Sequence, residues 1–102
     1  MSGTVNPELI NTLAIQIEDF ETEHLRIVEE TGCFGALPVE VICQANEIMV
    51  AARVLLKHAD EFSGGADLTY AVGEYRETEF LEDEFLSVVE AIKAIIREYR
   101  AA

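Results

Sequence analysis

Apolar residues recur every three or four positions along most of the chain, which is the spacing of one face of an α-helix. In the first third, this face consists of Ile10, Leu13, Ile17, Phe20, His24 and Ile27. Asn6 and Pro7 precede the run and suit the start of a helix, and Gly32 follows it and suits a helix end. The pattern predicts a first helix over residues 7–30.

A second run of apolar positions predicts a helix over residues 38–62, which Pro38 opens. Its main stripe is Val41, Ile42, Ala45, Ile48, Met49, Ala52, Leu55, Leu56, Ala59 and Phe62. Val50 and Val54 lie outside that stripe and widen the apolar face. Either this helix is the centre of the bundle, or its outer edge meets a second copy of the chain. We expect it to be the most buried helix, and we expect a homodimer whose contact includes Ile48, Val50 and Val54.

The Ser63-Gly64-Gly65 sequence is the clearest break in the pattern. A short element over residues 67–75 follows. It is helical if Asp67 caps it, and irregular or extended if Gly73 and the β-prone residues around it dominate.

The apolar phase then shifts, and a fresh stripe predicts a last helix over residues 79–100. Acidic residues near its start and basic residues near its end complement the helix dipole. Three long helices with short connections predict an all-α protein, an antiparallel bundle that forms a single domain over residues 1–102.

Composition changes this picture in one respect, which is the surface. The chain is 50% hydrophobic, yet its 20 Asp and Glu against 7 Lys and Arg give a net charge of -13. Such a chain folds and places its charges outside. The acidity argues against direct contact with nucleic acid and with anionic membranes, because phosphate contacts require Lys and Arg.

The first residues of the chain and its two cysteines are the evidence for its cellular compartment. We find no leader-like segment and no apolar run long enough for a bilayer, so we expect a cytoplasmic protein. Cys33 and Cys43 are then expected to be reduced thiols rather than a disulfide. Cys43 stands among apolar residues and is interpreted as a small core residue.

Glu21 and His24 have the Glu-x-x-His spacing with which one helix supplies two ligands to a di-iron site. The second such pair is missing, because Leu55 stands three positions before His58, the other histidine. We therefore expect His24 to be a structural residue at the edge of the core, and we expect no metal.

Glu18 and Glu21 have the Glu-x-x-Glu spacing that resembles the Mg²⁺ motif of small all-α nucleotide pyrophosphatases. The resemblance covers this motif alone, and the second helix offers no matching pair of carboxylates. A small metal-dependent nucleotide-hydrolysing enzyme is therefore an alternative function. We expect no catalytic residue and no cofactor, since no nucleophile has a recognisable base nearby.

Two clusters of acidic residues are the main candidates for a binding surface. They consist of Glu77, Glu79, Glu82, Asp83 and Glu84, and of Glu18, Asp19, Glu21 and Glu23. We expect a non-enzymatic protein that binds, and blocks, a basic protein surface such as that of a nucleic-acid-binding protein. Small antitoxins, immunity proteins and phage-encoded inhibitors share this short, acidic profile. A structural subunit with a salt-adapted surface is the remaining alternative.

Overall fold

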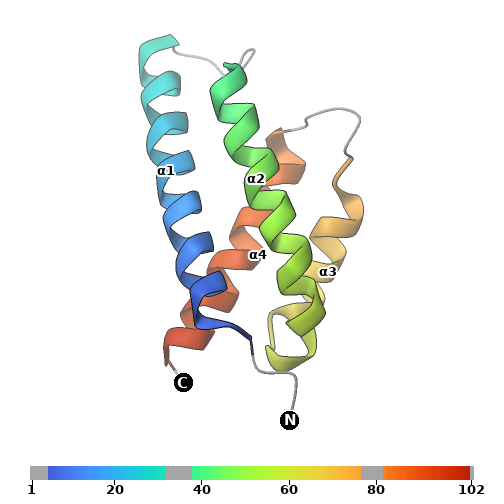
Figure 1. Cartoon of the computed structure of the whole chain (residues 1–102). Coiled ribbons are helices and arrows are strands. Elements are labelled where there is room, and N and C mark those ends of the chain that lie inside the picture. Colours follow the sequence, from blue (N-terminus) through green and yellow to red (C-terminus); the bar gives the residue numbers. More distant parts are fainter. Residues whose placement is uncertain (1–4, 32–37, 77–81, 102) are drawn as a thin grey trace.

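The computed structural model describes residues 5–31, 38–76 and 82–101, and these residues form helices joined by short connections (Figure 1). The elements are α1 (Pro7–Thr31), α2 (Val39–Leu55), the 3₁₀-helix η1 (Leu56–Glu61), α3 (Gly65–Glu74) and α4 (Glu82–Ala101). No strand occurs in this part of the chain, so the predicted all-α class is confirmed. The predicted start of the last helix, at residue 79, lies outside the described residues.

The chain direction alternates from each α-helix to the next (Figure 1). α1 packs mainly against α2, and α3 packs mainly against α4. α4 passes behind α2 in Figure 1 and also contacts α1, which joins the two pairs into one bundle. The short helix α3 therefore packs alongside the long helices.

The start of α1 has the cap that the sequence predicts. Asn6 Oδ1 accepts a hydrogen bond of 2.8 Å from the backbone N–H of Glu8, and the Asn6 carbonyl accepts from Leu9 and Ile10. Just before the cap, Val5 is buried and its N–H donates to Glu61 Oε1 at 3.2 Å. This bond ties the start of α1 to η1.

The predicted second helix is regular only as far as Leu55. η1 continues the chain to Glu61 with the tighter turns that often close a helix end. Phe62 then adopts an extended backbone, with φ -128° and ψ 145°, and its N–H bonds the Ala59 carbonyl. Over only six residues, apolar spacing does not distinguish a 3₁₀-helix from an α-helix. A single helix over residues 38–62 was therefore expected.

The stretch after the glycine break is helical, so the irregular alternative for residues 67–75 is wrong. Gly64 is its N-cap, and no side chain caps the helix, so the capping role expected for Asp67 is also wrong. Asp67 lies in the first turn instead, where a carboxylate is favourable. Thr69 Oγ1 donates to the Gly65 carbonyl at 2.9 Å, which satisfies this hydroxyl within the helix.

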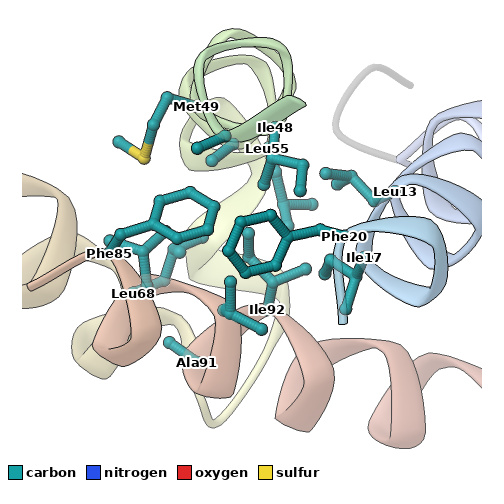
Figure 2. Close-up of a cluster of buried hydrophobic side chains, with 14 of the residues drawn as sticks. Leu13, Ile17, Phe20, Ile48, Met49, Leu55, Leu68, Phe85, Ala91 and Ile92 are labelled. Atoms are coloured by element: carbon teal, nitrogen blue, oxygen red, sulfur yellow. The ribbon is translucent and has the colours of Figure 1, made fainter. Parts of the chain in front are cut away.

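The core fills the space between the four helices and is almost entirely aliphatic. At its centre, Phe20 of α1 meets Phe85 of α4 edge to face, with ring centroids 4.9 Å apart (Figure 2). Leu13, Ile48 and Leu68 surround the two rings in Figure 2 and come from α1, α2 and α3. Each of the four helices therefore contributes to one continuous core.

Three expectations about α2 need correction. Ile48 is completely buried and cannot reach a second copy of the chain, whereas Val50 and Val54 are exposed. Cys43 is exposed rather than buried, because it lies on the outer side of α2 with Val50. α2 is not the single most buried helix, because α4 buries as wide a face: Phe85, Val88, Val89, Ala91, Ile92, Ile95 and Ile96.

Candidate docking site

The antiparallel pair α3 and α4 forms a surface groove with a volume of about 660 Å³. The alignment of α3 against α4 follows from two pairs of neighbouring residues. A Cβ built on Gly64, before α3, would lie 3.5 Å from Ile95 of α4, and the rings of Tyr75 and Phe85 lie 6.3 Å apart. The start of α3 therefore lies beside the second half of α4, and the end of α3 lies beside the start of α4.

The groove combines an apolar floor with an acidic border. Apolar side chains form most of the floor, namely Ala71, Leu86, Ala91 and Ala94. Carboxylates from both helices border it, namely Asp67, Glu74, Asp83, Glu84 and Glu90. Tyr70 also lines the groove and is 72% exposed. Such a lining suits a partner that presents basic groups around a small apolar contact.

These carboxylates have little positive charge near them. Within the described residues, the one ion pair that involves them joins Glu90 Oε2 to Lys93 Nζ at 3.7 Å. Glu84 Oε1 is removed from solvent and has no hydrogen-bond partner in this part of the chain. Because this oxygen is inaccessible, the acceptors that a partner molecule can reach are the exposed carboxylates of Asp67, Glu74, Asp83 and Glu90.

The sequence-based prediction located one wall of this groove and missed the other. Asp83 and Glu84 were predicted, and both line it. Glu82 begins α4, and Glu77 and Glu79 lie outside the described residues. The missed residues are Asp67, Tyr70 and Glu74 of α3 and Glu90 of α4. The available signal was the spacing, because Asp67 and Glu74, like Asp83 and Glu90, stand seven positions apart.

The second predicted cluster lies in another groove, of about 560 Å³, between α1 and α2. Glu18, Asp19 and Glu23 meet Glu40 of α2 there. Arg26 offsets part of this charge, because its guanidinium binds Glu23 at 2.9 Å. This hydrogen bond lowers the pKa of Glu23 below its ordinary value.

Arg26 binds Glu30 as well, also at 2.9 Å. Its two carboxylate partners raise the pKa of the guanidinium. The expected pair of Arg26 with Glu30 is therefore present. All of these groups are well exposed, so the contribution of each pair to stability is small.

Glu21 belongs to a different surface from the other members of its cluster. Its Oε2 accepts a hydrogen bond of 2.9 Å from Lys93 Nζ, which links α1 to α4. This bond raises the pKa of Lys93 above its ordinary value. Glu21 is therefore engaged within the chain and is not a free member of the acidic surface.

The residues of the metal hypothesis do not form a ligand cluster. His24 stacks on Phe20, with ring centroids 5.5 Å apart and planes at 10°. In residues 5–31, 38–76 and 82–101, no three His, Cys, Asp or Glu side chains converge as a metal site would require. Glu18 and Glu21, which have the Glu-x-x-Glu spacing, therefore gain no third ligand in this part of the chain.

Comparison of the chain with family models, with curated proteins and with solved structures gives no match. No helix within the described ranges is both long enough and apolar enough to cross a membrane. The two acidic grooves, between α3 and α4 and between α1 and α2, are the candidate binding surfaces.

Proposed function

We propose that this chain is a non-enzymatic interaction protein that binds a basic protein surface and thereby blocks it. The observation that supports this proposal is the groove between α3 and α4, where carboxylates from two helices border an apolar floor. We favour this groove over the one between α1 and α2, because the pair of Arg26 with Glu23 in the latter is close, at 2.9 Å, whereas the pair of Lys93 with Glu90 in the former is looser, at 3.7 Å. In the cytoplasm, the exposed thiol of Cys43 would remain reduced.

Charge and apolar contact would act at different stages of binding. The net charge of -13 attracts a basic partner over distances comparable to the Debye length and speeds the encounter. The floor and the exposed ring of Tyr70 then supply apolar area that stabilises the complex. The complex should therefore form quickly at low salt and persist in part at moderate salt.

Affinity capture from cells of the native host tests the proposal, with three charge-reversal variants compared. The first replaces Asp83 and Glu90 with Lys in the groove between α3 and α4. The second replaces Glu18 and Asp19 with Lys in the groove between α1 and α2. The matched control replaces Glu29 and Asp60 with Lys, because both are exposed, belong to neither groove and change the net charge equally.

The expected result is a retained basic protein, identified by mass spectrometry, that the Asp83 and Glu90 variant loses and the control keeps. Circular dichroism confirms that each variant is folded. Equal loss in all three variants would mean that net charge alone retains the protein, and loss in the second variant alone would move the site to the other groove. Either outcome, or the retention of no basic protein, would contradict the proposal.

We also propose that the chain forms a homodimer through α2. Val39, Val50 and Val54 are 71%, 63% and 42% exposed. With Cys43, they follow one side of the helix at helical spacing. α2 also has the smallest net negative charge of the four described α-helices, since Arg53 offsets one of its two acidic residues, Glu40 and Glu47. Two chains of net charge -13 therefore repel each other least at this surface.

A further inference from the structure

Building on the proposed function, we infer that the groove between α3 and α4 accepts an α-helix that carries arginines two turns apart along both of its edges. Four carboxylates determine the shape of the partner and the spacing of its basic residues. Asp67 and Glu74 are on α3, and Asp83 and Glu90 are on α4.

The four carboxylates form two rows, one along each helix. Within each helix the two residues stand seven positions apart, which is close to two turns and about 10.5 Å along the axis. Because α3 and α4 run antiparallel (Figure 1), residues near the end of α3, such as Glu74, and near the start of α4, such as Asp83, lie toward one end of the groove, and Asp67 and Glu90 lie toward the other. The two acidic rows therefore have the same residue spacing and border opposite sides of the floor.

A helix matches this length, and an extended chain does not. On a helix, residues seven apart lie on the same face and about 10.5 Å apart, which equals the spacing of the carboxylates. On a strand, side chains on one face repeat at about 6.8 Å, so the nearest spacings of about 6.8 and 13.6 Å miss one carboxylate of each row by 3 Å or more. A partner helix with basic residues at i and i+7 along each edge matches the spacing of both rows.

The floor of the groove determines which residues of the partner helix fit between its two basic edges. Ala71, Ala91 and Ala94 have short side chains, and the distance between packed helices falls with the size of the residues in contact. A helix with small apolar residues along its centre therefore approaches closely enough for its edges to meet the borders.

Arginine suits the borders better than lysine for two reasons. Its planar guanidinium binds a carboxylate through two parallel hydrogen bonds, which fixes the partner in register. It also stacks on aromatic faces, and Tyr70 presents an exposed ring on the α3 side of the groove.

The test uses two synthetic peptides of identical composition. Each is alanine-rich, blocked at both ends and about 20 residues long, since shorter isolated helices are marginal in water. In the matched peptide, four arginines form two edges, with i and i+7 spacing on each edge. In the shuffled peptide, the same arginines stand at i and i+5, which places them on different faces of the helix.

Fluorescence anisotropy at two salt concentrations measures binding to the unmodified chain and to its variants. The matched peptide should bind about tenfold more tightly than the shuffled one, as expected when several charge-assisted bonds depend on register. Replacing Asp83 and Glu90 with Lys should abolish that preference. Replacing Glu29 and Asp60 with Lys should preserve it while weakening both peptides alike. Tyr70→Ala should weaken the matched peptide by about two- to fivefold.

A milder variant, Asp83→Asn with Glu90→Gln, keeps the size of both side chains and covers the case in which the Lys variant unfolds. Equal binding of the two peptides to the unmodified chain would overturn the inference. If the capture experiment still yields a basic partner that needs Asp83 and Glu90, the proposed function stands without the helical occupant. A matched peptide that binds the Asn and Gln variant as tightly as the unmodified chain would also overturn the inference.

Discussion

Two glycines of α3 have different surroundings, and their substitution should have opposite effects. Gly65 is buried at the start of the helix, where an added Cβ would overlap the backbone carbonyl of Ala59. Gly73 is exposed near the end of the helix, and nothing lies within 4 Å of the position of its Cβ. One glycine is therefore required by close approach of the backbone, and the other is not.

We expect Gly65→Ala to lower the free energy of unfolding by roughly 1–3 kcal/mol, because the backbone of η1 or α3 must shift. Gly73→Ala should raise it by about 0.5–1 kcal/mol, because alanine favours the helix. Urea unfolding followed by circular dichroism measures both. A change of the same sign for the two variants would contradict this account.

A second residue-scale contact joins the turn before α3 to the end of α4. The carboxylate of Glu98 accepts hydrogen bonds from Ser63 Oγ at 2.7 Å and from the Ser63 backbone N–H at 3.0 Å. These bonds lower the pKa of Glu98 below its ordinary value of 4.5, the hydroxyl having the largest effect. The contact stabilises the fold at neutral pH, and this contribution is lost as the pH falls through the lowered pKa.

Ser63→Ala removes the hydroxyl and leaves the backbone donor, so the pKa of Glu98 should rise part of the way toward 4.5. Carboxyl-carbon NMR titration measures this shift. Ser87→Ala is the control, because its hydroxyl donates to the backbone carbonyl of Asp83 rather than to a carboxylate. An unchanged Glu98 titration in the Ser63 variant would show that the hydroxyl bond is absent in solution.

At the scale of a single element, the cap of α1 offers a direct test. Asn6→Ala removes the acceptor for the Glu8 N–H and should lower the free energy of unfolding by about 1 kcal/mol. Asn11→Ala is the matched control, because Asn11 is exposed inside the same helix and alanine has the higher helix propensity. In thermal unfolding, the melting temperature of Asn6→Ala should be lower than that of the unmodified chain, and that of Asn11→Ala should be equal or higher.

The exposed valines of α2, which form the proposed dimer contact, can also be tested within a single helix. Val50→Glu should convert the proposed dimer into a monomer, because it places a charge in the middle of the contact. Ile15→Glu makes the same chemical change at a residue of α1 that is 61% exposed, and should leave the dimer intact. Sedimentation velocity distinguishes these states. The homodimer is refuted if the unmodified chain sediments as a monomer at high concentration.

For the whole molecule, the dominant property is its net charge of -13. Self-repulsion of this charge destabilises the compact state, and added salt screens it, so the melting temperature should rise between low and moderate NaCl. The few ion pairs, such as Lys93 with Glu21, lose strength in salt but contribute little because they are exposed.

The variant with Lys at positions 29 and 60 tests the cause of this effect. Each replacement of an acidic residue by Lys changes the net charge by +2, so two of them change it from -13 to -9. The increase of its melting temperature with salt should be smaller than that of the unmodified chain. A melting temperature that falls on adding NaCl to the unmodified chain would contradict the account.

The sequence by itself determined the class, the first helix, its cap and the general position of the last helix. These features are local. Apolar spacing and the Asn6-Pro7 start depend on neighbours along the chain, so they are visible without knowledge of the packing. The apolar stripe from Ile10 to Ile27 was therefore identified as a core face before any partner helix was placed.

Only the tertiary structure decided which residues face one another. Ile48 and Val50 are two positions apart and apolar, yet the first is in the core and the second is outside, because α2 has α1, α3 and α4 on one side only. Asp67 and Glu90 stand 23 positions apart in the chain and border one groove. Such a juxtaposition depends on how α3 and α4 pack, and periodicity within a single helix contains no information about that packing.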